Sequence, residues 1–412
     1  MWTVRVALFC VALIAAACSA DEAPETVGFT ASEESGRRRT PAVDLDAALD
    51  ADLGACEPTP TGEPILIGMV MDFTDTSAFA DIPGSQAAAH LGALITCAGG
   101  VDGSPLEVAI VDSEGDGATA IVETNDLVDR GASFLIGPPF EEVGRPVLDA
   151  SAGRAAVFFA ASTERGLASA AEHGYLVTFD DRGQATAAAE YALEQGWTRA
   201  VTFTFPGPYF GTNPTVFSEA FEADDGVIVA DQRYVPIDDT DFSAQAAALD
   251  PVLRDGDVIY TAMLAFQLSA LRQDLAALGH DDLVFMTPDV FEATGGLAEP
   301  GLDGVIHTTH AFRDEGGRID RLIESYEQTT GEQLESGTFA GLYADSLLLG
   351  LQAMADCGCR SGSDVADAVN QINGFDGFTG PMTFEGTDGL PAKAVSIHQR
   401  VDGVDTLLAD WG

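Results

Sequence analysis

The histidines and cysteines are the first residues to test for chemistry. His307 and His310 (HTTH) could ligate a metal, but at i and i+3 of a strand they point to opposite faces. Cys357 and Cys359 (CGC) lack the usual zinc-ligand spacing, and no histidine is near them in sequence. No phosphate loop, HExxH or GxSxG pattern occurs, and no Ser/His/Asp set can be placed by spacing. We therefore expect no metal, no cofactor and no enzyme activity.

Polar residues that follow apolar runs suit non-covalent binding instead. The run FFAAST places Ala161, Ser162 and Thr163 after an expected strand, where hydroxyls and backbone N–H groups could hold an anion or amide oxygen. The alternative is an ordinary turn with an N-cap serine. Glu141 (PPFEE) and Asp289 (FMTPD) place carboxylates after two further runs, and a carboxylate suits an ammonium group. In open α/β sheets, ligands bind at such strand ends.

The elements that position these residues alternate along the chain. From residue 64, short apolar runs such as PILIGMVMD and LEVAIVDS alternate with helix-like segments such as GSQAAAHLGALITC. A second set begins at RGQATAAAEYALEQGW, and MTFEG and KAVSIHQRVDG look like a final antiparallel pair. Strands buried on both faces and separated by helices predict mainly parallel sheets. We expect an α/β fold of two doubly wound lobes joined by several crossings.

The charge balance excludes one class of partner. The sequence has 66 Asp and Glu against 19 Lys and Arg, a formal net charge of -47, and its single lysine is Lys393. The acids are scattered among apolar residues, which indicates a folded acidic surface. Nucleic acid is not an expected partner, because no basic stripe exists to meet phosphates. The acid-rich, lysine-poor composition fits either adaptation to salt or a GC-rich genome.

The N-terminus indicates export. After Arg5, residues 6–17 form an apolar run of 12 residues, too short for a membrane helix of ~20 residues. The sequence Ala15–Ala16–Ala17–Cys18 resembles the bacterial lipobox, which implies a lipidated Cys18 and a signal peptide over 1–18. The alternative is an ordinary signal peptide cleaved after Ala17. The acidic, Pro- and Ser-containing stretch 19–61 predicts a disordered tether, in which VDLDAALDADLG could form a short helix.

The other cysteines suit disulfides. An even number outside the cytoplasm favours pairing, with Cys56 joined to Cys97 at the end of the first expected helix. Cys357 and Cys359 are a second candidate pair, in the turn ADCGCRSG.

Six strings in the same order resemble one known family. They resemble the branched-chain amino-acid-binding (Leu/Ile/Val) branch of the type I periplasmic-binding fold, the substrate-binding proteins of ABC importers, over about residues 62–405. The strings are ILIGMVMDFTDT, ITCAGGVDGSPLEV, DLVDRGASFLIGPP, DDTDFSAQ, GLYADSL and GFDGFTGPMTFEGTDG. The resemblance implies a first lobe of residues 62–180 and 311–378, and a second lobe of residues 181–310 and 379–412. It also implies three crossings between the lobes, near residues 179–181, 307–312 and 378–381.

The resemblance also assigns roles to the strand-end residues. It implies that Ala161, Ser162 and Thr163 hold a ligand carboxylate and that Asp289 pairs with a ligand ammonium. Glu141 stands where the family usually has a serine, and its charge would repel a carboxylate. Either Glu141 caps the following helix, or the ligand differs from a simple amino acid. The implied cleft walls are Ser77, Phe79, Phe210 and Met263, each of which could instead be core packing.

These observations predict capture rather than turnover. We expect a monomeric, lipid-anchored protein at the outer face of the membrane, which closes on a small polar ligand (an amino acid, amide or related compound) and presents it to an ABC permease. The alternative is a ligand sensor of the same fold without transport. A secreted hydrolase on a doubly wound fold is the rival from the enzyme class, and turnover of ester, amide or glycoside substrates would support it.

Overall fold

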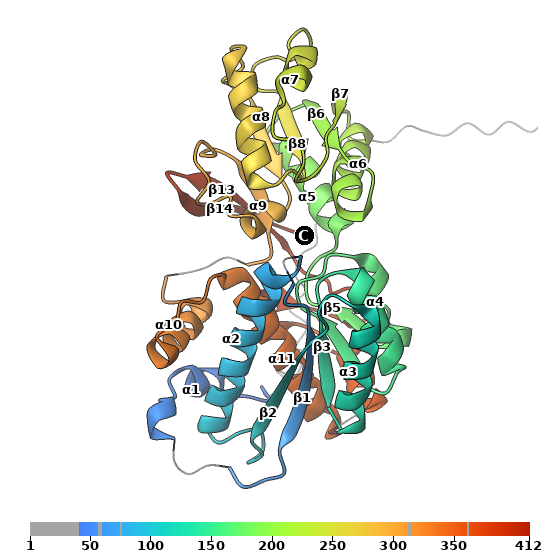
Figure 1. Cartoon of the computed structure of the whole chain (residues 1–412), viewed down its shortest axis with the longest axis vertical. Helices are drawn as coiled ribbons and strands as arrows, with labels where there is room; N and C mark the ends of the chain where they lie inside the picture. The colour runs from blue at the N-terminus through green and yellow to red at the C-terminus, as the bar shows by residue number, and fades with distance from the viewer. Residues whose placement is uncertain (1–40, 57–59, 75, 312–314, 361) are drawn as a thin grey trace, which may run out of the picture. The chain divides into compact units, whose positions relative to one another are not determined.

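The computed structural model describes residues 41–56, 60–74, 76–311, 315–360 and 362–412 (Figure 1). The expected signal peptide, Cys18 and the tether residues 19–40 lie outside these residues. Within the described part of the chain, no helix has the length and apolar character needed to cross a membrane.

The first lobe is built on a five-stranded parallel sheet. Its strand order is β2-β1-β3-β4-β5, the doubly wound pattern expected from alternating strands and helices. The middle strands are wholly apolar, as in FLIG and AVFF, because helices cover both faces. The strands are β1 (Ile65–Met71), β2 (Leu106–Asp112), β3 (Phe134–Gly137), β4 (Ala156–Phe159) and β5 (Gly174–Leu176).

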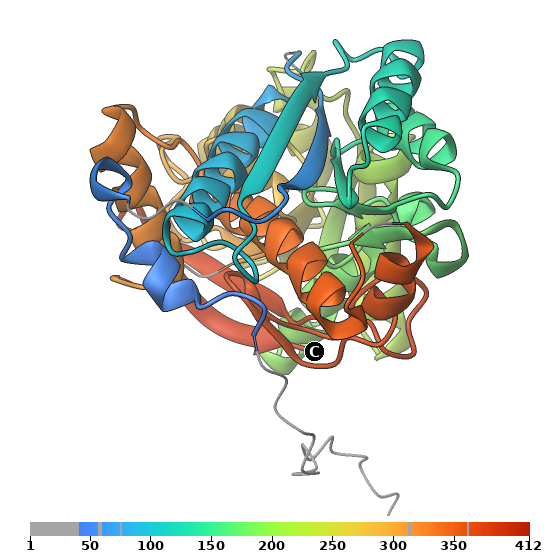
Figure 2. The ribbon, with the colours of Figure 1, turned by 90° about the horizontal axis from the view of Figure 1, so that it is seen from below.

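Helices cover the two faces of this sheet in two layers. Because successive side chains of a strand point to opposite faces of the sheet, Phe134 and Ile136 pack in one core and Leu135 packs in the other. Figure 1 shows α2 on one side of β1, with α3 and α4 on the other, and Figure 2 shows α11 beside α2. The helices are α2 (Ala78–Cys97), α10 (Arg318–Thr330), α11 (Gly337–Cys357) and α12 (Ser363–Val369) on one face, and α3 (Gly117–Asp129) and α4 (Glu141–Ser151) on the other. Short 3-10 turns, η2 (Arg165–Leu167) and η3 (Ala170–Glu172), precede β5.

The expected disordered tether was wrong over its last part. Residues 41–56 form α1 (Leu45–Leu49) and η1 (Leu53–Ala55), and the short helix proposed for this stretch is present. Leu49 is buried in the first-lobe core, and Figure 2 shows α1 beside α10. The buried Ala48 and Leu49 hold the helix against the lobe, and Arg321 of α10 adds exposed ion pairs to Asp46 at 2.7 Å and Asp50 at 2.8 Å.

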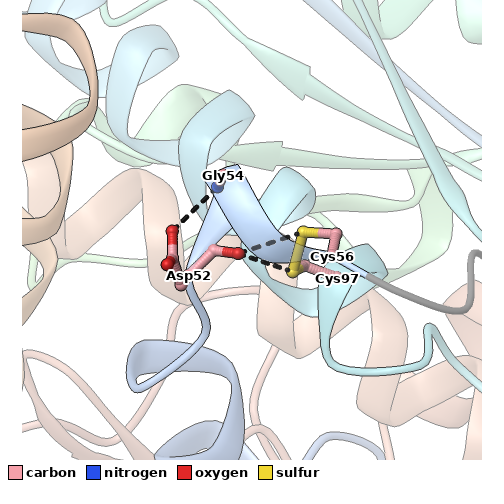
Figure 3. Close-up of a disulfide and its surroundings, with 4 residues drawn as sticks. All are labelled: Asp52, Gly54, Cys56 and Cys97. Atoms are coloured by element: carbon pink, nitrogen blue, oxygen red, sulfur yellow. Dashed lines mark hydrogen bonds between the residues drawn. A yellow bond between two sulfur atoms is a disulfide. The ribbon is translucent and has the colours of Figure 1, made fainter.

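Both cysteine pairs are joined as disulfides. Cys56 bonds to Cys97 at the end of α2, which ties residues 41–56 to the first lobe (Figure 3). The Asp52 carbonyl lies 3.4 Å from the Cys56 sulfur, and the Asp52 carboxylate accepts a hydrogen bond from the Gly54 amide (Figure 3). Cys357 bonds to Cys359 after α11.

The second lobe has a seven-stranded mixed sheet. Its order is β14-β13-β10-β9-β8-β6-β7, parallel except that β13 is antiparallel to both β10 and β14. The strands are β6 (Arg199–Thr204), β7 (Val227–Arg233), β8 (Val258–Thr261), β9 (Val284–Thr287), β10 (Ile306–Thr309), β13 (Val395–Val401) and β14 (Val404–Trp411). One face carries α5 (Asp181–Glu194) and α6 (Pro208–Ala223), and the other carries α7 (Ser243–Leu249), α8 (Ala265–Ala277) and α9 (Val290–Ala293).

The chain leaves the first lobe for the last time later than expected. The hairpin β11 (Phe375–Gly377) and β12 (Gly380–Met382) is followed by Phe384, which is buried in the first-lobe core. The amides of Phe384 and Glu385 both donate to the Ile372 carbonyl. The second lobe therefore resumes at β13 rather than at residue 379, because the apolar Met382 and Phe384 fill the first core. The closing antiparallel pair is β13 with β14, not MTFEG with KAVSIHQRVDG.

Candidate functional site

A cavity of about 300 Å³ lies where loops of the first lobe meet the first crossing and α6 of the second lobe. Its walls come from the loops after β3 and β4, from the start of α5 and from the start of α6. This is the carboxyl-end position at which doubly wound sheets bind ligands. The lining residues are Glu141, Thr163, Glu164, Arg165, Gly166, Asp180, Asp181, Arg182, Pro208 and Thr212.

Glu141 lines the cavity but does not cap its helix. It is the first residue of α4, after Phe140 at the N-cap position, and its amide N–H donates to the carboxylate of Glu164. Glu164 therefore supplies the capping acceptor that we considered for Glu141. The Glu141 carboxylate lies over Gly166, where an added Cβ would be 2.7 Å and 2.8 Å from its oxygens. A side chain at position 166 would therefore require the Glu141 carboxylate to shift.

Burial and crowded charge act on Glu164. Burial raises the pKa of Glu164, the hydrogen bond from the Glu141 amide opposes that rise, and the neighbouring charges of Glu141 and Glu142 add to it. The prediction for the loop after β4 names its hydroxyls and backbone N–H groups as donors, and Glu164 is not among the predicted residues.

Of the three expected donors after β4, Thr163 reaches the cavity. The Ser162 hydroxyl accepts a hydrogen bond from the Glu164 amide at 3.2 Å, and the Ser162 carbonyl accepts one from the Thr178 hydroxyl. Ala161 packs against the first-lobe core. Thr163 is buried, and its carbonyl accepts a hydrogen bond of 3.1 Å from the Asp181 amide.

Asp181 is a cavity residue that the sequence analysis treated only as part of a crossing. Burial raises its pKa to about 8, the charge of Asp289 adds to the rise, and hydrogen bonds from Thr163, Asn213 and Gln184 oppose it. The Gln184 amide lies 3.2 Å from the Asp181 carboxylate, and that of Asn213 lies 3.3 Å from it. The signal that could have found this residue is the pair of consecutive acids, Asp180 and Asp181, directly after the apolar run GYLVTF.

Asp289 lies at the start of α9, and side chains of the protein already surround its carboxylate. It accepts hydrogen bonds from Tyr209 at 2.6 Å, Gln184 at 2.9 Å and His310 at 3.0 Å. Burial would raise the pKa of Asp289, but these hydrogen bonds and the charge of His310 hold it below its usual value. Asp289 does not line the cavity, although Asn213 links its neighbour Tyr209 to Asp181.

The expected wall residues divide between surface and core. Phe79 is 39% exposed and contacts Phe140 and Phe339, with ring centroids 6.3 Å and 5.3 Å away. The Ser77 hydroxyl donates to Asp72 at 2.7 Å, so it faces its own loop. Phe210 is half-buried against the second-lobe core, and Met263 is fully buried within that core. For Met263 the structure therefore favours core packing over a cleft wall.

His307 and His310 have separate partners, as opposite strand faces require. His310 contacts Asp289, whereas His307 and His398 both contact Asp405, at 3.0 Å and 2.7 Å. Burial alone would raise the pKa of Asp405, but the hydrogen bonds and charges of the two imidazoles lower it well below the ordinary range. These three residues could present metal-ligand atoms within 4.8 Å of one another. In the structure Asp405 instead ties β14 to β10 and β13.

Comparison with known proteins shows the family to which the chain belongs. A family model described as periplasmic binding protein matches residues 64–404. The chain belongs to the periplasmic binding protein family. It is an extracytoplasmic solute-binding protein with the type I fold that the six strings predicted. Proteins that share this fold include solute- and substrate-binding proteins of ABC transporters. No curated protein matches the chain.

Solved structures share this fold at low sequence identity. The branched-chain amino-acid-binding protein LivJ from Streptococcus pneumoniae, in complex with isoleucine, is 21% identical, with a TM-score of 0.68 over 85% of this chain and 99% of that chain. The leucine-binding protein LivK from Thermotoga maritima is 17% identical, with a TM-score of 0.65 over 84% and 99%. A solute-binding protein from R. palustris, in complex with benzoate, is 17% identical, with a TM-score of 0.64 over 85% and 96%.

Proposed function

We propose that this solute-binding protein captures a small polar ligand in the cavity between its lobes and presents it to an ABC permease. The observation that carries the proposal is the cavity itself, because its walls include strand-end loops of the first lobe and the start of α6 in the second. A ligand there contacts groups from both lobes. The proposed contacts are Glu141, Thr163 and Glu164 from the first lobe, and Thr212 from the second.

Closure around the crossings would couple binding to shape. The lobes are joined between β5 and α5, between β10 and α10, and between β12 and β13. A ligand that gains contacts to both lobes only in a closed form shifts the population toward that form. A permease can then distinguish loaded from empty protein by the shape of the two lobes.

Family membership supports binding without turnover, because the family is one of periplasmic binding proteins and solved structures that share the fold are substrate-binding proteins. The cavity lining holds carboxylates, threonines and arginines, but no cysteine or histidine. We therefore propose that no bond is made or broken at this site. Stoichiometric binding without turnover of ester, amide and glycoside panels is the expected result.

We further propose that the protein works as a lipid-anchored monomer. Support comes from the lipobox-like sequence before Cys18 and from the acidic stretch that separates it from residue 41. Radioactive palmitate should label the wild-type protein in cells and fail to label Cys18→Ala. An unlabelled wild-type protein would leave simple export after an A-x-A cleavage.

Small-angle scattering tests the binding function. The radius of gyration should fall when a compound that raises the thermal midpoint is added to saturation. A ligand at 100 times its Kd stabilises the native state by about 2.7 kcal/mol, which a thermal-shift screen detects. An unchanged scattering envelope with a saturating compound would refute the closing mechanism.

A further inference from the structure

The basic residues of the cavity are already paired. The walls hold four carboxylates and two guanidinium groups. Arg165 contacts Asp180 at 3.0 Å, and Arg182 lies 3.6 Å from Glu219, which is outside the cavity lining. The two arginines therefore do not neutralise the remaining cavity acids.

Glu141 and Glu164 carry the uncompensated charge. Neither forms an ion pair with any residue that the structure describes. Asp181 differs because three neutral side chains donate to its carboxyl group. Two glutamates side by side at the cavity wall repel each other, and a cation placed between them removes that repulsion.

The protein's own carboxylates occupy the positions that could hold a ligand carboxylate. The first amide of α4, on Glu141, points at a natural anion position, and Glu164 already accepts its hydrogen bond. The Thr163 hydroxyl bonds to the carboxyl of Asp181, and the Ser162 hydroxyl accepts from the Glu164 amide. A ligand carboxylate would have to displace Glu164 and would then stand beside two like charges.

We propose that the ligand is an organic cation without a free carboxylate, an amine or guanidinium compound held by Glu141 and Glu164. The proposal rests on the solute-binding function proposed above and names the ligand class of the same cavity. A buried cation is stabilised only when it is paired and hydrogen-bonded, and these glutamates supply both requirements. Neutral amides satisfy the geometry but leave the glutamate repulsion in place.

Isothermal titration with matched probes tests this inference on the purified mature protein. Each pair differs by one carboxylate: agmatine against arginine, and isopentylamine against leucine. Isovalerate and benzoate supply carboxylates without an amine, and Ca²⁺ tests for an inorganic cation. We expect at least one amine of a pair to bind ~10-fold or more tighter than its amino acid, since a ligand carboxylate that is desolvated beside like charges without a free donor costs roughly that factor or more.

Three variants locate the effect. Glu141→Gln and Glu164→Gln each remove one charge, and each should weaken the bound amine by about 10- to 100-fold. Glu142→Gln is the matched control, because Glu142 is exposed in the same first turn of α4 but does not line the cavity. It should change the Kd by less than about 3-fold, as expected for a screened surface charge. Unchanged thermal midpoints of the unliganded variants would show that each still folds.

The outcomes separate the ligand class from the general function. Binding of leucine, isovalerate or benzoate without binding of either amine would overturn the cation proposal and leave the solute-binding function intact. Binding of Ca²⁺ alone would also overturn it. Failure of the whole panel to bind would count against both proposals. An equal loss of amine binding in Glu142→Gln and Glu141→Gln would refute the role of the cavity wall.

Discussion

Replacing the single lysine of the chain should destabilise the junction between the lobes. Lys393 lies in the last crossing, just before β13, and is half-buried. Its ammonium donates to the Val177 carbonyl at 3.1 Å, beside the first crossing, and to the Thr379 hydroxyl. Asp345 of α11 accepts hydrogen bonds from the Thr379 amide at 2.9 Å and the Phe378 amide at 2.6 Å. Lys393 is thus the positive charge that faces the buried Asp345.

The magnitude follows from the charge that is left behind. Burial lowers the pKa of Lys393 to about 8, and the charge of Asp345 opposes this fall. Burial raises the pKa of Asp345, and the charge of Lys393 opposes this rise. Each group therefore depends on the other for its charged form. Removing one partner of a fully buried pair costs about 3 to 5 kcal/mol, and the low end applies here because Lys393 is half-buried. Asp345 keeps its hydrogen bonds from Phe378 and Thr379, so we expect Lys393→Met to cost about 3 kcal/mol.

Urea unfolding at pH 7 measures this cost. The double variant Lys393→Met/Asp345→Asn should recover at least about 1 kcal/mol relative to additivity, because the stranded charge is gone. Arg130→Met is the control, since Arg130 forms only exposed ion pairs, with Glu107 and Asp126, and should cost less than about 1 kcal/mol. A loss below ~1 kcal/mol for Lys393→Met, or strict additivity in the double variant, would refute the reasoning.

Three further predictions concern stability. Burial raises the pKa of Asp81 to about 8. The protonated Asp81 therefore contributes stability that is fully present below about pH 4 and is lost as the pH rises to about 8. In paired thermal scans, Asp81→Asn should be more stable than wild type at pH 8.5 and similar to it at pH 4.5. Folding lowers the pKa of Asp405, so its contribution to the free energy of unfolding is present above about pH 4 and is lost as the pH falls. Asp405→Asn should therefore be less stable than wild type at pH 7, and its stability should fall less steeply as the pH is lowered below about 4. An equally steep fall in acid would contradict this. The Cys56–Cys97 disulfide spans 41 residues, and Cys56→Ser/Cys97→Ser should unfold about 3 to 4 kcal/mol more easily in urea; an unchanged midpoint would show that η1 is held without it.

Local patterns predicted most of the fold. Alternating apolar runs and helix-like segments indicated two doubly wound lobes, and the parallel order of β1 to β5 confirms this. The segment ends were harder to predict, because their partners are remote in sequence. Residues 41–56 look like a tether in sequence, but Ala48 and Leu49 are buried in the first-lobe core and Arg321, more than 250 residues away, pairs with the nearby acids. Phe384 likewise joins the first core through Ile372, which extends that lobe beyond residue 378.

The candidate site was predictable in position and only partly in its residues. Glu141 and Thr163 follow apolar runs, and both line the cavity. Asp289 also follows one, yet its carboxylate is shared among side chains from α5, α6 and the end of β10. Glu164 was not predicted because its role depends on a hydrogen bond that its carboxylate accepts from the Glu141 amide of α4, and no local sequence spacing indicates this contact.

Residue order alone sets the strand period of two, the helical period of 3.6, the acidic balance and the strand-end loops, since each depends on near neighbours. The tertiary structure then determines the partner of each charge. Glu164 accepts a hydrogen bond from an amide 23 positions away, and Asp289 accepts one from Gln184, 105 positions away. Lys393 donates one to the carbonyl of Val177, 216 positions away. Whether a carboxylate is paired, protonated or left to face a ligand depends on such distant contacts, because burial and neighbouring charge, rather than chain position, determine its free energy.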